Sequence, residues 1–123
     1  MALVLVLSAD LMFSSRLQAQ LQAAGHELEI VGDTERLGVR LAAGERAPEA
    51  LLADLTDESL GAAVAVEELR EQGALAGART LAYYSHVDVA SRDRAREAGF
   101  DLVVPRSRIA REAPQLLEGL IGA

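Results

Sequence analysis

The chain has 123 residues, half of them apolar, which is enough for one domain with a hydrophobic core. Its net charge of −7 argues against general nucleic-acid binding, and the lack of cysteine excludes disulfides and thiolate metal sites. The apolar N-terminus meets Ser8 and Asp10 too soon to be a signal peptide or a membrane span. We therefore expect residues 1–123 to form a single cytoplasmic domain without a membrane partner, beginning with a buried strand.

Short apolar runs alternate with longer amphipathic stretches along the chain. The runs predict strands at residues 3–7, 28–31, 50–53, 80–84 and 102–104. The stretches predict helices over 11–24, from Asp33 or Thr34 to about 43, from Asp57 to about 73, from Asp88 to 99 and over 114–121, with Asp10 as the cap of the first. This alternation predicts an α/β fold, a doubly wound five-stranded parallel sheet of order 2-1-3-4-5. Chemistry in such a sheet takes place beyond the carboxyl ends of the strands.

Pro114 sets the expected start of the last helix. A proline inside a helix costs roughly 3 kcal/mol, whereas the first helical position accepts it. Residues 107–112 are therefore expected to form a separate turn or short helical piece. That arrangement would place Arg106, Arg108 and Arg111 on a loop, as a basic rim able to meet an acidic partner or a bound anion.

The two histidines and the paired tyrosines give weaker signals. His26 falls at a helix–strand turn and is expected on the surface, while His86 follows a strand, where a plain polar loop role is favoured over shaping a pocket. Neither histidine has zinc spacing or a Ser-His-Asp order around it. Of Tyr83 and Tyr84, one is expected in the core and the other against a helix or the sheet edge. No nucleotide-binding glycine motif follows the first strand.

Three pieces of the chain follow one another with a recognisable spacing. They are PEALLAD at 48–54, Ser85 after TLAYY, and RAREAGFD at 94–101. In this order they resemble the receiver domains of response regulators, the CheY-like class of the flavodoxin-like fold. The resemblance extends over the whole chain. It places Asp54 at the family's phosphorylated aspartate, a candidate phosphoacceptor, and Ser85 at the family's Ser or Thr after strand four.

The chain departs from that family where the metal is held. Receivers carry two adjacent acidic residues after strand one, which bind Mg²⁺, and this chain has Ser8 and Ala9 there. Asp10 is one position late, so Asp10 with Asp54 would make at most a weak Mg²⁺ site, and the role of helix cap is favoured. No cofactor other than such weakly bound Mg²⁺ is expected.

The family's lysine after strand five is also missing, because all twelve basic residues are arginine. Pro105 or Arg106 takes its place. Arginine neutralises a phosphoryl oxygen, but its planar fork does not replace a point ammonium without rearrangement. Without the metal and the lysine, charge on a transferring phosphoryl group loses most of its stabilisation.

Three functions remain open from the sequence. The favoured one is a pseudo-receiver, a non-enzymatic signalling module that contacts a protein such as a histidine kinase or another signalling protein, or a second copy of itself. The second is a working response regulator phosphorylated on Asp54, whose catalysis is limited to its own phosphorylation and dephosphorylation. The third is a flavodoxin-like protein that binds a small molecule. The arginines at 92–96 fit a partner face, although alternating charges are also typical of a solvated helix face.

Overall fold

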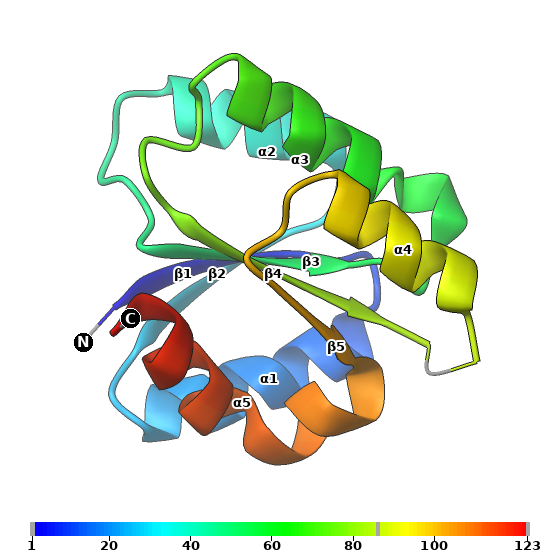
Figure 1. Ribbon diagram of the computed structural model, residues 1–123. Coiled ribbons are helices and arrows are strands. Elements are labelled where there is room, and N and C mark those ends of the chain that lie inside the picture. Colours follow the sequence, from blue (N-terminus) through cyan, green and yellow to red (C-terminus); the bar gives the residue numbers. More distant parts are fainter. Residues whose placement is uncertain (1, 86, 123) are drawn as a thin grey trace.

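The computed structural model describes residues 2–85 and 87–122 and contains one five-stranded parallel sheet of order β2-β1-β3-β4-β5, as predicted (Figure 1). The strands are β1 (Leu3–Leu7), β2 (Glu27–Val31), β3 (Ala50–Asp54), β4 (Arg79–Tyr84) and β5 (Leu102–Pro105). The helices are α1 (Leu11–Ala23), α2 (Thr34–Ala42), η1 (Glu58–Leu60, a 3₁₀ helix), α3 (Ala62–Glu71), α4 (Val89–Glu97) and α5 (Arg106–Ile121).

Helices cover both faces of the sheet, α1 and α5 on one and α2, α3 and α4 on the other (Figure 1). Strands β1 and β3 are buried along their whole length, because each has a strand on either side and helices above and below. Successive side chains alternate between the two cores, so that Val4 packs toward α1 and α5 while Leu5 packs toward the other layer. Tyr83 and Tyr84 divide in the same way, and both are buried.

Aspartates start most of the helices, as the sequence predicts. The carboxylates of Asp10, Asp33 and Asp88 each accept a hydrogen bond from the backbone N–H three residues on, at the starts of α1, α2 and α4. The prediction that Asp57 starts the third long helix is wrong. Asp57 caps the short η1, and α3 begins only after Gly61, whose left-handed φ of 65° interrupts the helical path.

The last helix is broken before Pro114, which confirms the predicted interruption. Glu112 has φ −127° and ψ 24°, outside the helical region. The chain is nevertheless helical from Arg106 onward, so the expectation of a loop carrying three arginines is wrong. Proline disturbs only the turn that precedes it, which leaves residues 106–111 free to form their own helical turns. Arg108 borders a separate hollow with Asp101, so the arginines do not form one rim.

The expectation that His26 lies at the surface is also wrong. The turn after α1 folds this residue over the start of β1, where it is 8% exposed. Its Nδ1 accepts a hydrogen bond of 3.1 Å from the backbone N–H of Ala2. His86 lies outside the described residues, so its expected role is not tested.

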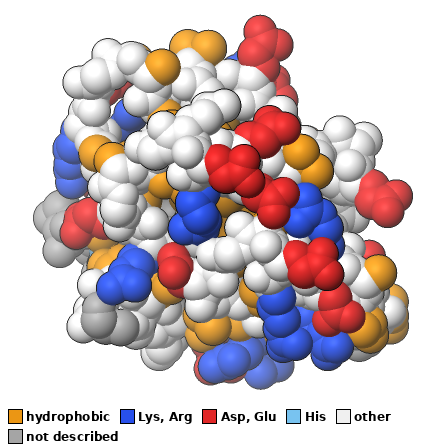
Figure 2. All heavy atoms as spheres, turned by 45° about the horizontal axis from the view of Figure 1, so that its top comes forward, with side chains coloured by type: hydrophobic (Ala, Val, Ile, Leu, Met, Phe, Trp, Pro, Cys, Tyr) orange, Lys and Arg blue, Asp and Glu red, His pale blue; other side chains and the backbone are white. Residues whose placement is uncertain are grey.

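Charges on the α2–α3–α4 side are mixed in sign. Figure 2 shows acidic and arginine side chains interspersed over this part of the surface. On α4, Arg94 pairs with Glu67 of α3 at 3.0 Å and Arg92 with its neighbour Asp93 at 3.3 Å. This pairing favours the interpretation of α4 as a solvated helix face. Within residues 2–85 and 87–122, no helix is both long enough and apolar enough to cross a bilayer.

Candidate functional site

The residues singled out from the sequence lie at one end of the sheet. Asp54 ends β3 and pairs in register with Tyr83, one residue before the end of β4, so Ser85 directly follows the neighbouring strand. Asp10 follows β1, and Arg106 follows β5. Because all the strands are parallel, these four side chains share the carboxyl edge, where ligands of open α/β sheets bind.

Asp54 is almost fully buried, with 1% exposure, and protein hydrogen bonds engage both of its oxygens. The Ser8 hydroxyl donates to Oδ2 at 2.9 Å. The backbone N–H of Thr56 donates to Oδ1 at 2.8 Å, and the Thr56 hydroxyl donates to the same oxygen at 2.5 Å. Neither Ser8 nor Thr56 is predicted from the sequence as a partner of Asp54. The contact with Thr56 could have been predicted, since an aspartate side chain often accepts a hydrogen bond from the backbone N–H two residues further on.

Asp10 and Arg106 form a second polar pair beside the first. Asp10 Oδ1 accepts from the Phe13 N–H at 3.0 Å, and Oδ2 accepts from Arg106 Nη2 at 3.1 Å. The Arg106 guanidinium lies 4.3 Å from the centre of the Phe13 ring, a cation–π contact that fixes its position. The backbone N–H of Asp10 donates to Ser8 Oγ at 3.1 Å, which links the two pairs.

This set of donors does not fit the Mg²⁺ that the resemblance implies. Mg²⁺ requires near-octahedral oxygen ligands and commonly uses one or two carboxylates together with water. Both Asp10 oxygens are committed to a helix start and to an arginine, and both Asp54 oxygens accept hydrogen bonds. Ser8 supplies a neutral hydroxyl where an acidic side chain would stand. Among the described residues, no three His, Asp or Glu side chains gather as a metal site would need.

Tyr83 brings a further buried polar group to this region. It is fully buried, and its hydroxyl has no hydrogen-bond partner among the described residues. Burial is the main cause of a raised pKa for this hydroxyl, and the nearby negative charge of Asp54 adds to it, while the neighbouring Ser8 hydroxyl acts in the opposite direction without forming a hydrogen bond of good geometry. Tyr83 is therefore neutral at physiological pH and cannot act there as a base.

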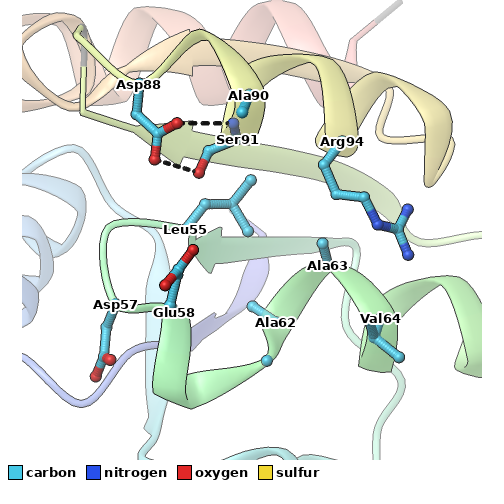
Figure 3. Close-up of a pocket in the computed structure, with 11 residues that line it drawn as sticks. Leu55, Asp57, Glu58, Ala62, Ala63, Val64, Asp88, Ala90, Ser91 and Arg94 are labelled. Carbon is cyan, nitrogen blue, oxygen red and sulfur yellow. Dashed lines mark hydrogen bonds between the residues drawn. The ribbon is translucent and has the colours of Figure 1, made fainter.

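Two hollows open near the carboxyl edge. The first, which we call the arginine hollow, has a volume of about 560 Å³ and is lined by Phe13, Arg16, Thr56, Ser85, Arg106, Ser107 and Ala110. The second, of about 300 Å³, lies between η1, α3 and α4 (Figure 3). The Asp88 carboxylate, which borders the second hollow, accepts hydrogen bonds from the backbone N–H and the hydroxyl of Ser91. Leu55 and Ala62 contribute to an apolar lining.

Comparison with known proteins supports the fold. No protein-family model matches the chain, and no curated protein matches it. A candidate response regulator from Chloroflexus aurantiacus has a TM-score of 0.87 at 16% identity, covering 99% of this chain and 98% of its own. A response regulator from Thermotoga maritima has a TM-score of 0.83 at 11% identity, with the same coverages.

A third similar structure is the receiver domain of a sensor histidine kinase from Pseudomonas aeruginosa, which has a magnesium ion in its active-site cleft. It has a TM-score of 0.77 at 20% identity and covers 99% of this chain and 98% of its own. At these identities the likeness establishes the architecture. The chain has the CheY-like, flavodoxin-like fold of receiver domains over nearly its whole length.

Proposed function

We propose that this chain is a receiver-like signalling module that acts through contact with another protein, without ordinary Mg²⁺-dependent phosphorylation of Asp54. The observation that carries the proposal is the hydrogen bonding of the Asp54 carboxylate by Ser8 and Thr56. A phosphoacceptor must offer an oxygen to the phosphorus atom while nearby cations stabilise the charge on the transferring group. Here hydroxyl groups hold both oxygens, and the positions of the acidic pair carry Ser8 and Ala9.

The cation after β5 supports the same proposal. Arg106 stands at or next to the place of the receiver lysine, yet it is bound to Asp10 and lies against the Phe13 ring. This guanidinium would have to break its contacts with Asp10 and with the Phe13 ring before it could move to a phosphoryl group on Asp54. The proposed module therefore signals through its surface, and its partner is a histidine kinase, another signalling protein or a second copy of the chain.

Direct labelling of Asp54 tests the proposal. The wild-type protein is incubated with phosphoramidate or acetyl phosphate, with and without MgCl₂, and its intact mass is measured by mass spectrometry. We expect no covalent adduct in the wild type or in Asp54→Asn. The double variant Ser8→Asp plus Ala9→Asp, which restores an acidic pair, is the positive control and is compared only after its folding in MgCl₂ is verified by circular dichroism.

A Mg²⁺-dependent adduct on the wild type that Asp54→Asn abolishes would identify a working response regulator and contradict the proposal. Multi-angle light scattering across a concentration series separately tests the second copy as partner. A mass that stays monomeric up to high concentration would remove self-association and leave a different protein as the partner.

A further inference from the structure

The arginine hollow at the carboxyl edge is lined only by neutral and basic side chains among the described residues, in a chain whose net charge is −7. Two arginines reach it from different elements, Arg16 from α1 and Arg106 from the start of α5. Hydroxyl groups contribute as well, since Ser85 follows β4 and Ser107 lies in the first turn of α5. Cations and hydroxyl donors are the composition of an anion-binding site. The two carboxylates next to the hollow are already paired, Asp10 with Arg106 and Asp54 with Thr56.

The donors in this hollow are available for a ligand. Arg16 is exposed and forms no hydrogen bond or ion pair with the described residues. Arg106 uses one nitrogen, Nη2, on Asp10, while the Phe13 ring fixes the plane of its guanidinium, so its remaining N–H groups are oriented in advance. The side-chain hydroxyls of Ser85 and Ser107 are likewise without protein partners among the described residues.

The number and arrangement of donors favour a phosphate group over a carboxylate. A phosphate group carries a charge of about −1.5 to −2 near neutral pH and three strong acceptor oxygens, which suits two guanidinium forks and two hydroxyls together. The volume of about 560 Å³ falls within the range of roughly 300–1,000 Å³ for small-molecule sites. A neighbouring hollow of about 280 Å³ shares Phe13, Arg16 and Ala110 and extends along α1 past Leu17, leaving room for the body of a phosphoester.

We propose that the arginine hollow binds a phosphate group noncovalently between Arg16 and Arg106, either as inorganic phosphate or as part of a small phosphoester. This inference goes beyond the proposed function, because it involves no bond to Asp54 and requires no metal. Bound phosphate would bridge α1 and α5 beside the loops after β3 and β4, so its presence would alter the surface that a protein partner meets.

Titration with inorganic phosphate tests the site, followed by ¹⁵N chemical shifts at constant ionic strength in metal-free buffer. We expect saturable shifts that centre on residues lining the hollow. Arg16→Gln and Arg106→Gln should each weaken binding about tenfold or more, the loss expected when one charge-assisted contact is removed. Arg108→Gln is the matched control for Arg106→Gln, since it also removes one positive charge from α5 but lies outside this hollow. It should change the Kd for phosphate by less than about twofold.

Two further titrations distinguish a phosphoester from free phosphate as the ligand and test whether Asp54 takes part in binding. Tighter binding of glycerol phosphate than of inorganic phosphate would identify a phosphoester as the ligand, and equal affinity would identify free phosphate. Asp54→Asn should bind phosphate at least as tightly as the wild type does, because it removes a negative charge beside the hollow. Absence of saturable binding, equal losses in all three arginine variants, or loss of binding in Asp54→Asn would overturn the inference. The labelling experiment on Asp54 is separate, so a failure there leaves this site untouched.

Discussion

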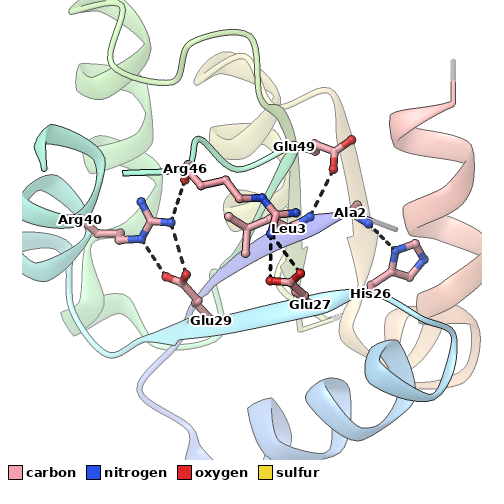
Figure 4. Close-up of polar contacts among 8 residues, drawn as sticks. All are labelled: Ala2, Leu3, His26, Glu27, Glu29, Arg40, Arg46 and Glu49. Carbon is pink, nitrogen blue, oxygen red and sulfur yellow. Dashed lines mark hydrogen bonds and ion pairs between the residues drawn. The ribbon is translucent and has the colours of Figure 1, made fainter. Parts of the chain in front are cut away.

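At the amino end of the parallel strands, several polar groups pair with one another (Figure 4). The backbone N–H of Ala2 donates to His26, and that of Leu3 donates to Glu49 at 3.3 Å. The two glutamates of β2 pair with arginines of the following segment, Glu29 with Arg40 at 2.8 Å and Glu27 with Arg46 at 3.0 Å. These contacts tie the start of β1 to the residues just before β2 and β3, and the edge strand β2 to α2 and the segment after it.

The carboxyl end is organised differently. Its buried carboxylate, Asp54, accepts hydrogen bonds from the hydroxyls of Ser8 and Thr56 and from the backbone N–H of Thr56, and no cation pairs with it among the described residues. The ion pair of Asp10 with Arg106 is about two-fifths exposed on both sides. Arg16 and Ser85 border an open hollow without protein partners among the described residues. The difference is that the polar side chains named at the amino end are paired, whereas at the carboxyl end a paired cluster around Asp54 stands next to Arg16 and Ser85, which have no protein partner among the described residues. Substitutions of paired residues at either edge should therefore change stability, whereas substitution of the unpaired Arg16 should change binding alone.

The largest expected effect on the free energy of unfolding comes from an aspartate in place of Ser8 at the carboxyl edge. Ser8→Asp would place a second carboxylate against buried Asp54, where like charges without a cation should cost about 3 kcal/mol at neutral pH. Urea unfolding with and without MgCl₂ measures the effect, and added Mg²⁺ should recover part of the loss. Ser8→Ala, which removes the hydroxyl that donates to Asp54 and accepts from the Asp10 N–H but adds no charge, should cost about 1 to 2 kcal/mol. Equal losses in the two variants would show that charge at this position is tolerated.

The next effect belongs to the amino edge. His26→Ala leaves the buried N–H of Ala2 without an acceptor, and we expect a loss of about 2 kcal/mol in the free energy of unfolding. His26→Asn is the control, because its side-chain oxygen can take the place of Nδ1 and should restore a large part of the loss. If alanine and asparagine destabilise the protein equally, the hydrogen bond contributes little and packing of the ring accounts for the effect.

A smaller effect is expected for the best-formed ion pair of the amino edge. Arg40 contacts both Glu29 oxygens and the backbone carbonyl of Arg46, and Arg40→Ala should cost about 1 kcal/mol, the upper end for such surface pairs. A double-mutant cycle with Glu29→Ala isolates the pair. Arg16→Gln, from the other edge, should change stability by less than about 0.5 kcal/mol. A loss for Arg16→Gln as large as that for Arg40→Ala would break the contrast between the edges.

Acid titration of the same pair adds a second readout. The hydrogen bond from Arg40 holds the pKa of Glu29 below its ordinary value of 4.5. Because the folded-state pKa is the lower one, the contribution of the pair is present above about pH 4.5 and is lost as the pH falls through the folded-state value. The stability difference between the wild type and Arg40→Ala should shrink in that window. A difference that stays constant into acid would assign it to packing of the arginine stem.

The smallest effect should be a gain. Tyr83→Phe removes a buried hydroxyl that lacks a protein partner, so stability should stay equal or rise by up to about 1 kcal/mol. Because the folded-state pKa of Tyr83 is raised above the ordinary value of 10.0, the wild type should lose stability relative to the variant as the pH rises beyond that value. Urea unfolding at neutral and alkaline pH measures both. A loss above about 1 kcal/mol at neutral pH would mean that the hydroxyl has a partner in solution.

Sequence alone determined the architecture because its signals are local. Continuous apolar runs predict buried parallel strands, and Asp10, Asp33 and Asp88 mark helix starts within three residues of the groups they cap. Pro114 likewise predicts a break in the last helix, and the break lies two residues before it, at Glu112. From these elements the right-handed crossover rule leads to the observed strand order and to a carboxyl edge that gathers Asp10, Asp54, Ser85 and Arg106.

Tertiary structure alone decided which of these groups meet. Ser8 reaches Asp54 across 46 residues and Arg106 reaches Asp10 across 96, contacts that depend on the packing of β1, β3 and α5. The burial of His26 and the place of Arg16 beside the hollow have the same origin. Local propensities act over a few residues, whereas burial and hydrogen bonding between distant segments are set by how whole elements pack. The sequence could therefore indicate where a site would lie, and only the folded chain determined which donors there are paired and which are free.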